Sequence, residues 1–319
     1  MSRILALACL AALVCTMRAE APSGSLQTAD AALQAGEADK ALTLLDSLPA
    51  SAEQHNLRCR VRFALEQWDV ALVECERAVS MEENNSRYHM WLARVLGEKA
   101  SRASFMSAFS LAKRSRAEFE TSVRLDGRNA DALADLGEFY KSAPGVVGGG
   151  TDKAEGVAAQ MDKVDPARGH QLHGWIAEEQ KDYATTEREL KAAIGVDSHP
   201  AFAWMSLASF YRRRQQWDDM QAALQSGIQA AQRDRQAGVA LYNGASVLIK
   251  ANRDLQQAAK MIEDYLKSSS MTEEAPAFAA HTQLARVFNR IGDTAGAREQ
   301  RGQALALAHE YKPAQDLKL

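Results

Sequence analysis

A fixed spacing of large and small residues recurs along this chain, and that period constrains the fold more than any other feature. The clearest copy begins at residue 201, with large side chains at unit positions 4, 7, 11, 17 and 24 and a small one at position 8: Trp204, Leu207, Tyr211, Trp217, Leu224 and Ala208. Copies in the same register begin 34 residues earlier, at 167, and again at 278. A period of this length indicates a stack of repeated structural units, because one unit cannot bury its apolar face alone.

The eighth unit position is the best test of this register. From the second unit to the eighth it holds only small residues: Cys59, Ala93, Gly137, Gly174, Ala208, Ser246 and Ala285. A column of small side chains predicts that the two helices of each unit approach closely there. The composition agrees, because alanine is abundant and prolines are few, at 7 in 319 residues.

This spacing resembles the tetratricopeptide repeat (TPR) family. The resemblance implies an all-α, right-handed superhelical solenoid with no single core, whose first helices line a concave groove for a protein or peptide partner. Residues 22–319 would form the repeat domain, with units at about 22–51, 52–85, 86–129, 130–166, 167–200, 201–238, 239–277 and 278–311. The segments WLARVLGEKA and LGEFYKSAPGVVGGGTDKA further resemble a group of secreted bacterial TPR-repeat proteins of uncharacterised function, which implies nothing about the partner.

Residues 1–21 have the pattern of a secretory signal peptide. Arg3 precedes an apolar run that ends at Arg18, and the small-x-small triplet 19–21 follows. The run is shorter than the roughly 20 apolar residues that cross a bilayer, which favours cleavage over a retained anchor. We therefore expect a periplasmic or secreted protein. Its net charge of -3 and lack of a charged tail argue against binding to nucleic acid, or to membranes beyond the signal peptide.

The unit positions that face the groove predict a partner site. These positions are mainly basic, and the residues we expect to contact a partner are Arg60, Arg94, Trp175, Arg212, Arg213, Lys250 and Arg286. Guanidinium groups beside an exposed ring suit an acidic or carboxylate-ended peptide. The alternative is that these arginines are solvated or paired with neighbouring carboxylates. The leading hypothesis is a non-catalytic scaffold for protein interactions that needs no cofactor.

His170 and His173 lead to a second hypothesis, a metal-dependent enzyme. An i, i+3 histidine pair on a helix, followed by Glu178 and Glu179, has the residue types of a zinc site. The repeat offers a structural explanation for His170, because unit position 4 holds a ring in most units: His55, His89, His170, Trp204, Tyr242 and His281. The chain also lacks the HExxH and GxSxG motifs of metalloproteases and serine hydrolases. We therefore expect no enzyme.

Cys59 and Cys75 are the two cysteines beyond the signal peptide, one in each helix of the second unit. In an oxidising compartment they could form a disulfide. However, position 8 faces roughly position 20 of the second helix, so Cys75 at position 24 lies about one turn away. A bridge requires Cα atoms within about 6.8 Å. The sequence leaves a disulfide and two buried thiols both open.

The stretch APGVVGGGTDKA at 143–154 invites comparison with a phosphate-binding loop. Thr151 and Asp152 stand where such a loop needs Lys and Ser/Thr, and the segment before it reads as a repeat helix rather than a strand. We therefore expect an enlarged turn, with Pro144 ending the first helix and Thr151 or Asp152 capping a second helix near Lys153. The unit at 86–129 carries about ten extra residues, which predict a longer second helix after a loop around 99–104.

Overall fold

The computed structural model describes residues 23–319, so the expected signal peptide at 1–21 lies outside the described residues. The described chain forms eight helical hairpins and a short last helix. The hairpins are α1 (Ser23–Gln34) with α2 (Ala38–Asp46), α3 (Ala52–Ala64) with α4 (Trp68–Met81), α5 (Ser86–Arg102) with α6 (Phe105–Leu125), α7 (Ala130–Ser142) with α8 (Thr151–Met161), α9 (Pro166–Glu179) with α10 (Tyr183–Val196), α11 (Ala201–Arg213) with α12 (Trp217–Arg233), α13 (Gly238–Ala251) with α14 (Leu255–Leu266), and α15 (Ala277–Arg290) with α16 (Thr294–Leu307). The last helix, α17 (Lys312–Gln315), packs on α15 and α16.

The helical repeat solenoid expected from the period is confirmed. In this part of the chain, no helix combines the length and the apolar character needed to cross a membrane.

Small residues at the eighth unit position lie where helices touch. Ala93, Ala208 and Ala285 are fully buried. A Cβ added at Gly174 would lie 3.2 Å from Cγ of Leu190 in the second helix of the same hairpin. These contacts explain why the column tolerates no large side chain.

The turns inside several hairpins share one backbone conformation. Glu66, Lys181 and Gln215 follow the first helix of their hairpins with φ of 59°, 63° and 58°. The next amide then bonds back to a carbonyl five residues earlier, as from Gln67 to Arg62 at 2.9 Å. This is a Schellman ending, which satisfies the last carbonyls of one helix immediately before the next begins.

The hairpin of α5 and α6 absorbs its extra residues in both helices. We expected a longer second helix after a loop around 99–104, but α5 continues to Arg102 and α6 begins at Phe105, so the loop has only two residues. The lengthened hairpin leaves Phe105 and Met106 83% and 77% exposed.

The glycine-rich stretch forms an enlarged turn, as its position in the repeat predicted. α7 ends before Pro144, and a short 3-10 turn covers Gly145–Val147 before α8 begins. The predicted cap is wrong, because Gly150 occupies the N-cap position of α8 and no side chain caps it. Gly150 has a φ of 157°, and its amide donates to the Tyr140 carbonyl at 2.8 Å, which ties the turn back to α7.

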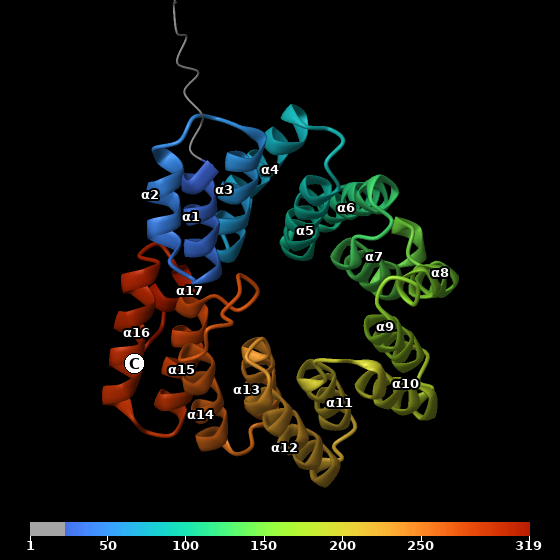
Figure 1. Cartoon of the computed structure of the whole chain (residues 1–319), viewed down its shortest axis with the longest axis vertical. Coiled ribbons are helices and arrows are strands. Elements are labelled where there is room, and N and C mark those ends of the chain that lie inside the picture. The colour runs from blue at the N-terminus through green and yellow to red at the C-terminus, as the bar shows by residue number, and fades with distance from the viewer. Residues whose placement is uncertain (1–22) are drawn as a thin grey trace, which may run out of the picture.

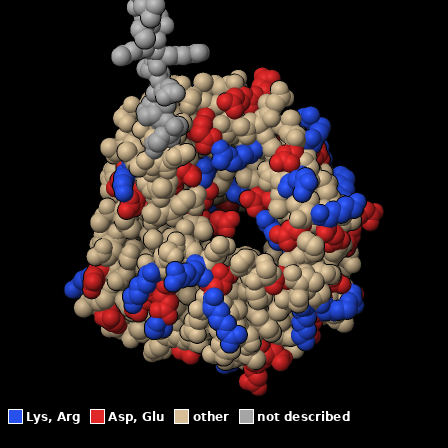
Figure 2. Space-filling view, in the orientation of Figure 1, with Lys and Arg blue, Asp and Glu red and all other residues tan. Residues whose placement is uncertain are grey.

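The solenoid closes into a ring. Figure 1 shows the hairpins arranged around a central opening, with α1 to α3 beside α15 to α17, and Figure 2 shows the opening passing through the molecule. Side chains of both ends share one apolar cluster, in which Leu33, Leu45 and Leu57 pack with Phe278 and Tyr311. The concave groove expected from the repeat is therefore the inner face of a ring, on which the first helices of the hairpins lie.

Polar contacts join the two ends where they meet, which we call the seam. Arg60 of α3 donates two hydrogen bonds to the carboxylate of Glu273, at 2.7 and 2.8 Å, and lies 2.8 Å from Asp30. Gly36 has a φ of 71°, and a Cβ there would lie 2.1 Å from the backbone nitrogen of Ala277. Only glycine allows this approach of the two ends.

Candidate functional site: the inner face of the ring

Arg60 was expected to contact a partner, but the structure places it in the seam. Its side chain is only 5% exposed and is occupied by Glu273 and Asp30. Burial alone would lower the pKa of this guanidinium, but the two carboxylates outweigh that effect and raise the pKa. Arg60 therefore holds the ring together and is not accessible to a partner.

Arg94 and Arg213 are also paired with carboxylates of neighbouring hairpins. Arg94 donates from Nε to Asp135 at 2.6 Å. Arg213 donates two hydrogen bonds to Glu178, at 2.5 and 2.7 Å. For these two residues the structure agrees with the alternative interpretation, in which groove arginines are neutralised by carboxylates.

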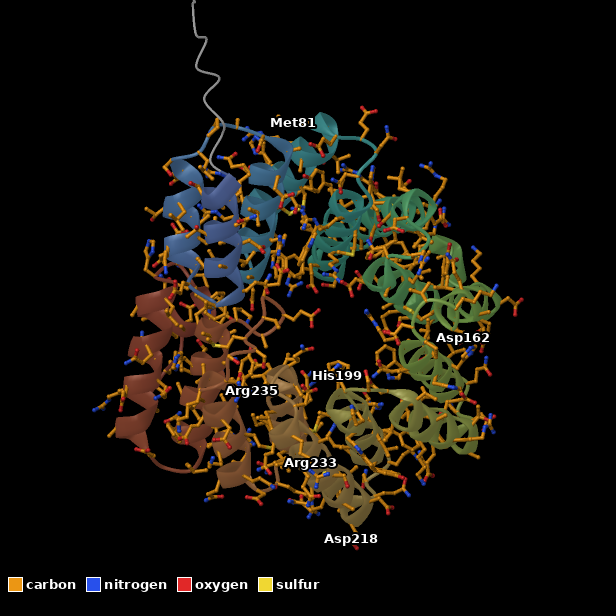
Figure 3. The ribbon with its side chains drawn as sticks, in the orientation of Figure 1. Met81, Asp162, His199, Asp218, Arg233 and Arg235 are labelled. Atoms are coloured by element: carbon orange, nitrogen blue, oxygen red, sulfur yellow. A yellow bond between two sulfur atoms is a disulfide. The ribbon has the colours of Figure 1, made fainter. Side chains whose placement is uncertain are left out.

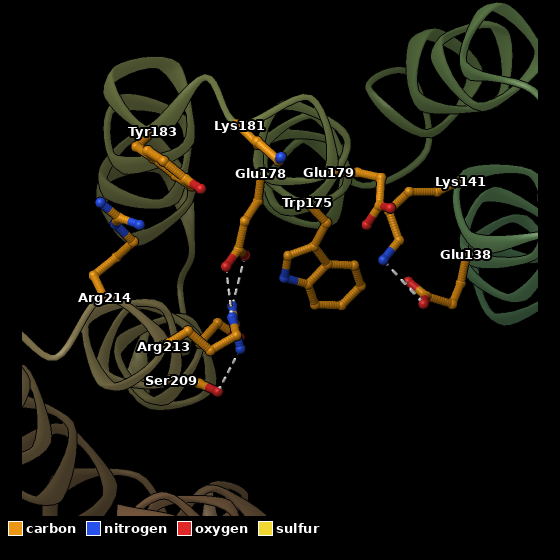
Figure 4. Close-up of a pocket in the computed structure, with 11 residues that line it drawn as sticks. Glu138, Lys141, Trp175, Glu178, Glu179, Lys181, Tyr183, Ser209, Arg213 and Arg214 are labelled. Carbon is orange, nitrogen blue, oxygen red and sulfur yellow. Dashed lines mark hydrogen bonds and ion pairs between the residues drawn. The ribbon is translucent and has the colours of Figure 1, made fainter.

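Trp175 lies in a pocket of about 610 Å³ on the inner face, shown in Figure 4. The indole is flanked by Lys141 of α7 on one side and by Arg213 of α11 on the other. Glu138 and Glu178 pair with these two cations. The pocket therefore offers an apolar ring surface beside two ion pairs.

The other predicted residues are spread along the inner face. Arg212 keeps a buried Nε that has no hydrogen-bond partner among the described residues, and burial together with the charge of Arg213 lowers its pKa. Lys250 is exposed and lines a small pocket of about 210 Å³ between α11 and α13. Arg286 is exposed on α15. The structure thus does not bring the predicted residues together into one site.

A larger cavity that the sequence did not indicate lies on the inner face beside the seam. We call it the seam pocket: it has a volume of about 930 Å³ and is lined by α3, α5, α6 and α7 and by residues 273–279. Six aromatic side chains contribute to its wall: Phe63, Trp68, Trp91, Phe119, Phe139 and Tyr311. Apolar residues and Pro144 complete much of the rest. Its lining comes from residues 63–144 and from residues 273–311, so segments far apart in the sequence together build this pocket.

Comparison with known proteins gives likenesses of structure only. No protein-family model matches the sequence. No curated protein matches it either. Among solved structures, a thermophilic TPR protein of Thermus thermophilus has a TM-score of 0.45 and 20% identity, covering 62% of this chain and all of that one. The C-terminal part of a TPR-repeat protein of Cytophaga hutchinsonii has a TM-score of 0.42 and 15% identity, and the match covers 92% of this chain and all of that one. PilW, a type IV pilus biogenesis factor, has a TM-score of 0.42 and 18% identity, and the match covers 70% of this chain and 97% of that one.

The spacing and packing of this chain's own helices identify its fold. The first helices of neighbouring hairpins begin 34 residues apart at Ala52 and Ser86, and 35 apart at Pro166 and Ala201. Each hairpin packs beside the next, with small side chains at the eighth position in contact. The fold of this chain is TPR-like. Its closed ring is what distinguishes it from the open solenoid that the repeat predicts.

Four histidines of this TPR-like ring occupy unit position 4 and bond to the second helix of their own hairpins. In each case Nδ1 meets a side-chain oxygen: His55 with Glu74 at 2.6 Å, His89 with Glu118 at 2.6 Å, His170 with Glu189 at 2.8 Å and His281 with Gln300 at 2.7 Å. The packing role expected for rings at this position is therefore accompanied by a repeated polar contact.

The rings of His170 and His173 are directed to different carboxylates. His170 bonds to Glu189 of α10, while His173 bonds to Glu155 of α8 at 2.8 Å and to Asp162 at 3.2 Å, a residue labelled in Figure 3. Burial tends to lower the pKa of His173, but the two carboxylates raise it overall. A metal ligand must be a neutral imidazole, so this environment favours the form that does not bind metal. Within residues 23–319, no group of three or more His, Cys, Asp and Glu is placed to hold a metal ion.

Cys59 and Cys75 are joined by a disulfide in the structure, with their Cα atoms 5.2 Å apart. The bond links α3 to α4, and Cys59 directly precedes Arg60 in α3. Both sulfur-bearing side chains are fully buried.

Proposed function

We propose that this TPR-like protein is a non-catalytic scaffold that holds a segment of a partner protein on the inner face of its ring, with the seam pocket as the anchor. The observation that carries the proposal is the concentration of aromatic side chains in a cavity of about 930 Å³. Binding energy in protein interfaces is concentrated in such pockets, where aromatic rings bury an anchoring side chain of the partner.

The proposal places the protein in the periplasm or outside the cell. The signal-like pattern of residues 1–21 supports this location. A buried disulfide between Cys59 and Cys75 supports it as well, because such bonds persist in oxidising compartments. The groove arginines no longer favour an acidic partner, because Arg60, Arg94 and Arg213 are already paired with carboxylates.

A site-specific photo-crosslink tests the proposal. Ser101 and Ser142 line the seam pocket, whereas Ser110 lies exposed on the adjoining helix outside it. A benzoylphenylalanine at position 142 or 110, irradiated in envelope extract, should give a discrete protein adduct from position 142 and none from position 110. Excess unlabelled protein should compete for the adduct.

Excess protein with Ser101→Trp, which fills the pocket, should compete at least about tenfold less well, and Ser110→Trp should compete normally. Equal adducts at both positions, or no adduct at position 142, would contradict the proposal.

A further inference from the structure

The charges around the seam pocket are not balanced. Its lining contains the carboxylates Glu66, Glu98, Asp135, Glu138, Glu273 and Glu274 and one cation, Arg94. Four of these carboxylates pair with a cation in the structure: Glu98 with Arg102, Asp135 with Arg94, Glu138 with Lys141 and Glu273 with Arg60. Glu66 only accepts a long hydrogen bond from Tyr311, at 3.4 Å. An excess of negative charge therefore remains at the pocket.

Glu274 is a carboxylate of this pocket that has no partner among the described residues. It directly follows Glu273, which holds the seam, and no hydrogen bond or ion pair to Glu274 is found among the described residues. Glu274 is exposed at the pocket, yet the surrounding protein raises the pKa of its carboxyl by desolvation. The nearby guanidinium groups of Arg94 and Arg168 are engaged by Asp135 and Asp131. A carboxylate in this setting gains most from a cation supplied by a ligand.

The aromatic wall suits the same ligand. Phe63 packs edge-to-face with Trp68 and Trp91, with ring centroids 5.1 and 5.4 Å apart. Two of these rings already accept guanidinium groups, since Arg102 lies over Trp68 and Arg94 over Trp91, each 4.6 Å from the centroid. Aromatic faces attract cations through the quadrupole of the ring. The apolar area of Phe119 and Phe139 adds room for a neighbouring aliphatic or aromatic side chain.

We propose that the seam pocket binds a partner segment in which an arginine or lysine stands beside an apolar residue, with the cation pairing with Glu274 and the apolar side chain packing on the aromatic wall. This inference rests on the proposed function and specifies the chemistry of the partner. It is opposite in charge to the acidic peptide that the groove positions suggested, because Arg60, Arg94 and Arg213 are paired with carboxylates in the structure.

Selection from a random peptide display library against the purified protein tests the inference. Peptides enriched on the wild type should contain Arg or Lys next to Leu, Ile, Phe or Trp. Glu274→Gln should lower the affinity of the synthesised peptides about tenfold or more. Glu299→Gln, on the exposed surface of α16, is the matched control and should leave their affinity unchanged.

The outcomes separate this inference from the proposed function. If enriched peptides are displaced by filling the pocket with Ser101→Trp but carry no basic residue, or bind equally well to the Glu274→Gln variant, the inference fails and the scaffold proposal stands. If peptide binding is insensitive to Ser101→Trp, the pocket is not the anchor and both fail. Competition by spermidine as strong as that by the peptide would also contradict a peptide-specific site.

Discussion

Histidines at the same unit position have pKa values shifted in opposite directions. His89 bonds to the Glu118 carboxylate, and that hydrogen bond raises the pKa of the imidazole despite its burial. His281 faces the neutral Gln300, so burial prevails and lowers the pKa. The sequence predicted a ring at this position in both units, but not its partner, because the apolar register does not show which polar side chains on the second helix face back.

Replacing the neutral partner should reverse the behaviour of His281. In Gln300→Glu, we expect the pKa of His281 to rise above 6.5, because the carboxylate stabilises the imidazolium. A histidine whose pKa is higher in the folded than in the unfolded protein stabilises the fold at low pH. This stabilisation is complete below the unfolded-state pKa of about 6.5 and is lost as the pH rises through the folded-state pKa. The variant should therefore gain stability over wild type near pH 6 compared with pH 8, by about 1.4 kcal/mol per pKa unit.

NMR titration of the imidazole Cε1–H resonance measures the pKa directly. Gln303→Glu, exposed on the same helix, serves as the control and should leave the resonance of His281 unchanged. A lower or constant pKa in Gln300→Glu would show that desolvation outweighs the added charge.

At the scale of the helices, the sequence predicted the hairpins well but predicted the turns and helix ends poorly. The small residues of the eighth column located the contacts between helices. The turns were harder to predict, because Glu66, Lys181 and Gln215 adopt the left-handed conformation that glycine would have signalled. The expected cap of α8 was also wrong. Thr151 or Asp152 was expected to cap this helix, but its N-cap residue is Gly150, which has no side chain that could accept a hydrogen bond.

The seam is the element contact whose strength can be tested by mutation. Glu273→Gln leaves the buried Arg60 with Asp30 alone, and we expect a loss of about 3 kcal/mol in the free energy of unfolding. Glu310→Gln breaks the more exposed pair with Arg62 across the same seam, and its cost should be about 1 kcal/mol or less. Urea denaturation of both variants gives the comparison, and equal losses would contradict a special role of the Arg60 pair.

At the scale of the whole molecule, the repeat predicted the solenoid but not its closure. Curvature accumulates from small rotations between neighbouring units, and several units here depart from 34 residues, so the path of the chain cannot be summed from the period. The candidate site depends on that path. Asp135 and Glu178 reach Arg94 and Arg213 from neighbouring hairpins, as any stack of units would allow. Residues 273–276, by contrast, reach the seam pocket beside α3 and α5 only because the ring closes.

Closure should also change how the molecule opens. Terminal units of an open solenoid have one neighbour and exchange their amide hydrogens first. In this ring α1 and α16 are covered by each other's hairpins, so hydrogen–deuterium exchange should protect them about as well as α9 and α10. In Glu273→Gln we expect exchange to rise selectively in α1, α2, α15 and α16. Fraying of these helices in the wild type would argue that the ends separate in solution.

The contact between Gly36 and Ala277 has a consequence for the evolution of such chains. An open solenoid can duplicate or delete a unit, since each unit meets only its immediate neighbours. Here the backbone of the first hairpin must meet the start of α15 at a distance that leaves no space for a Cβ. One unit more or fewer would displace that meeting point, so the number of repeats is set by the geometry of the circle and should change only together with a new joint between first and last units.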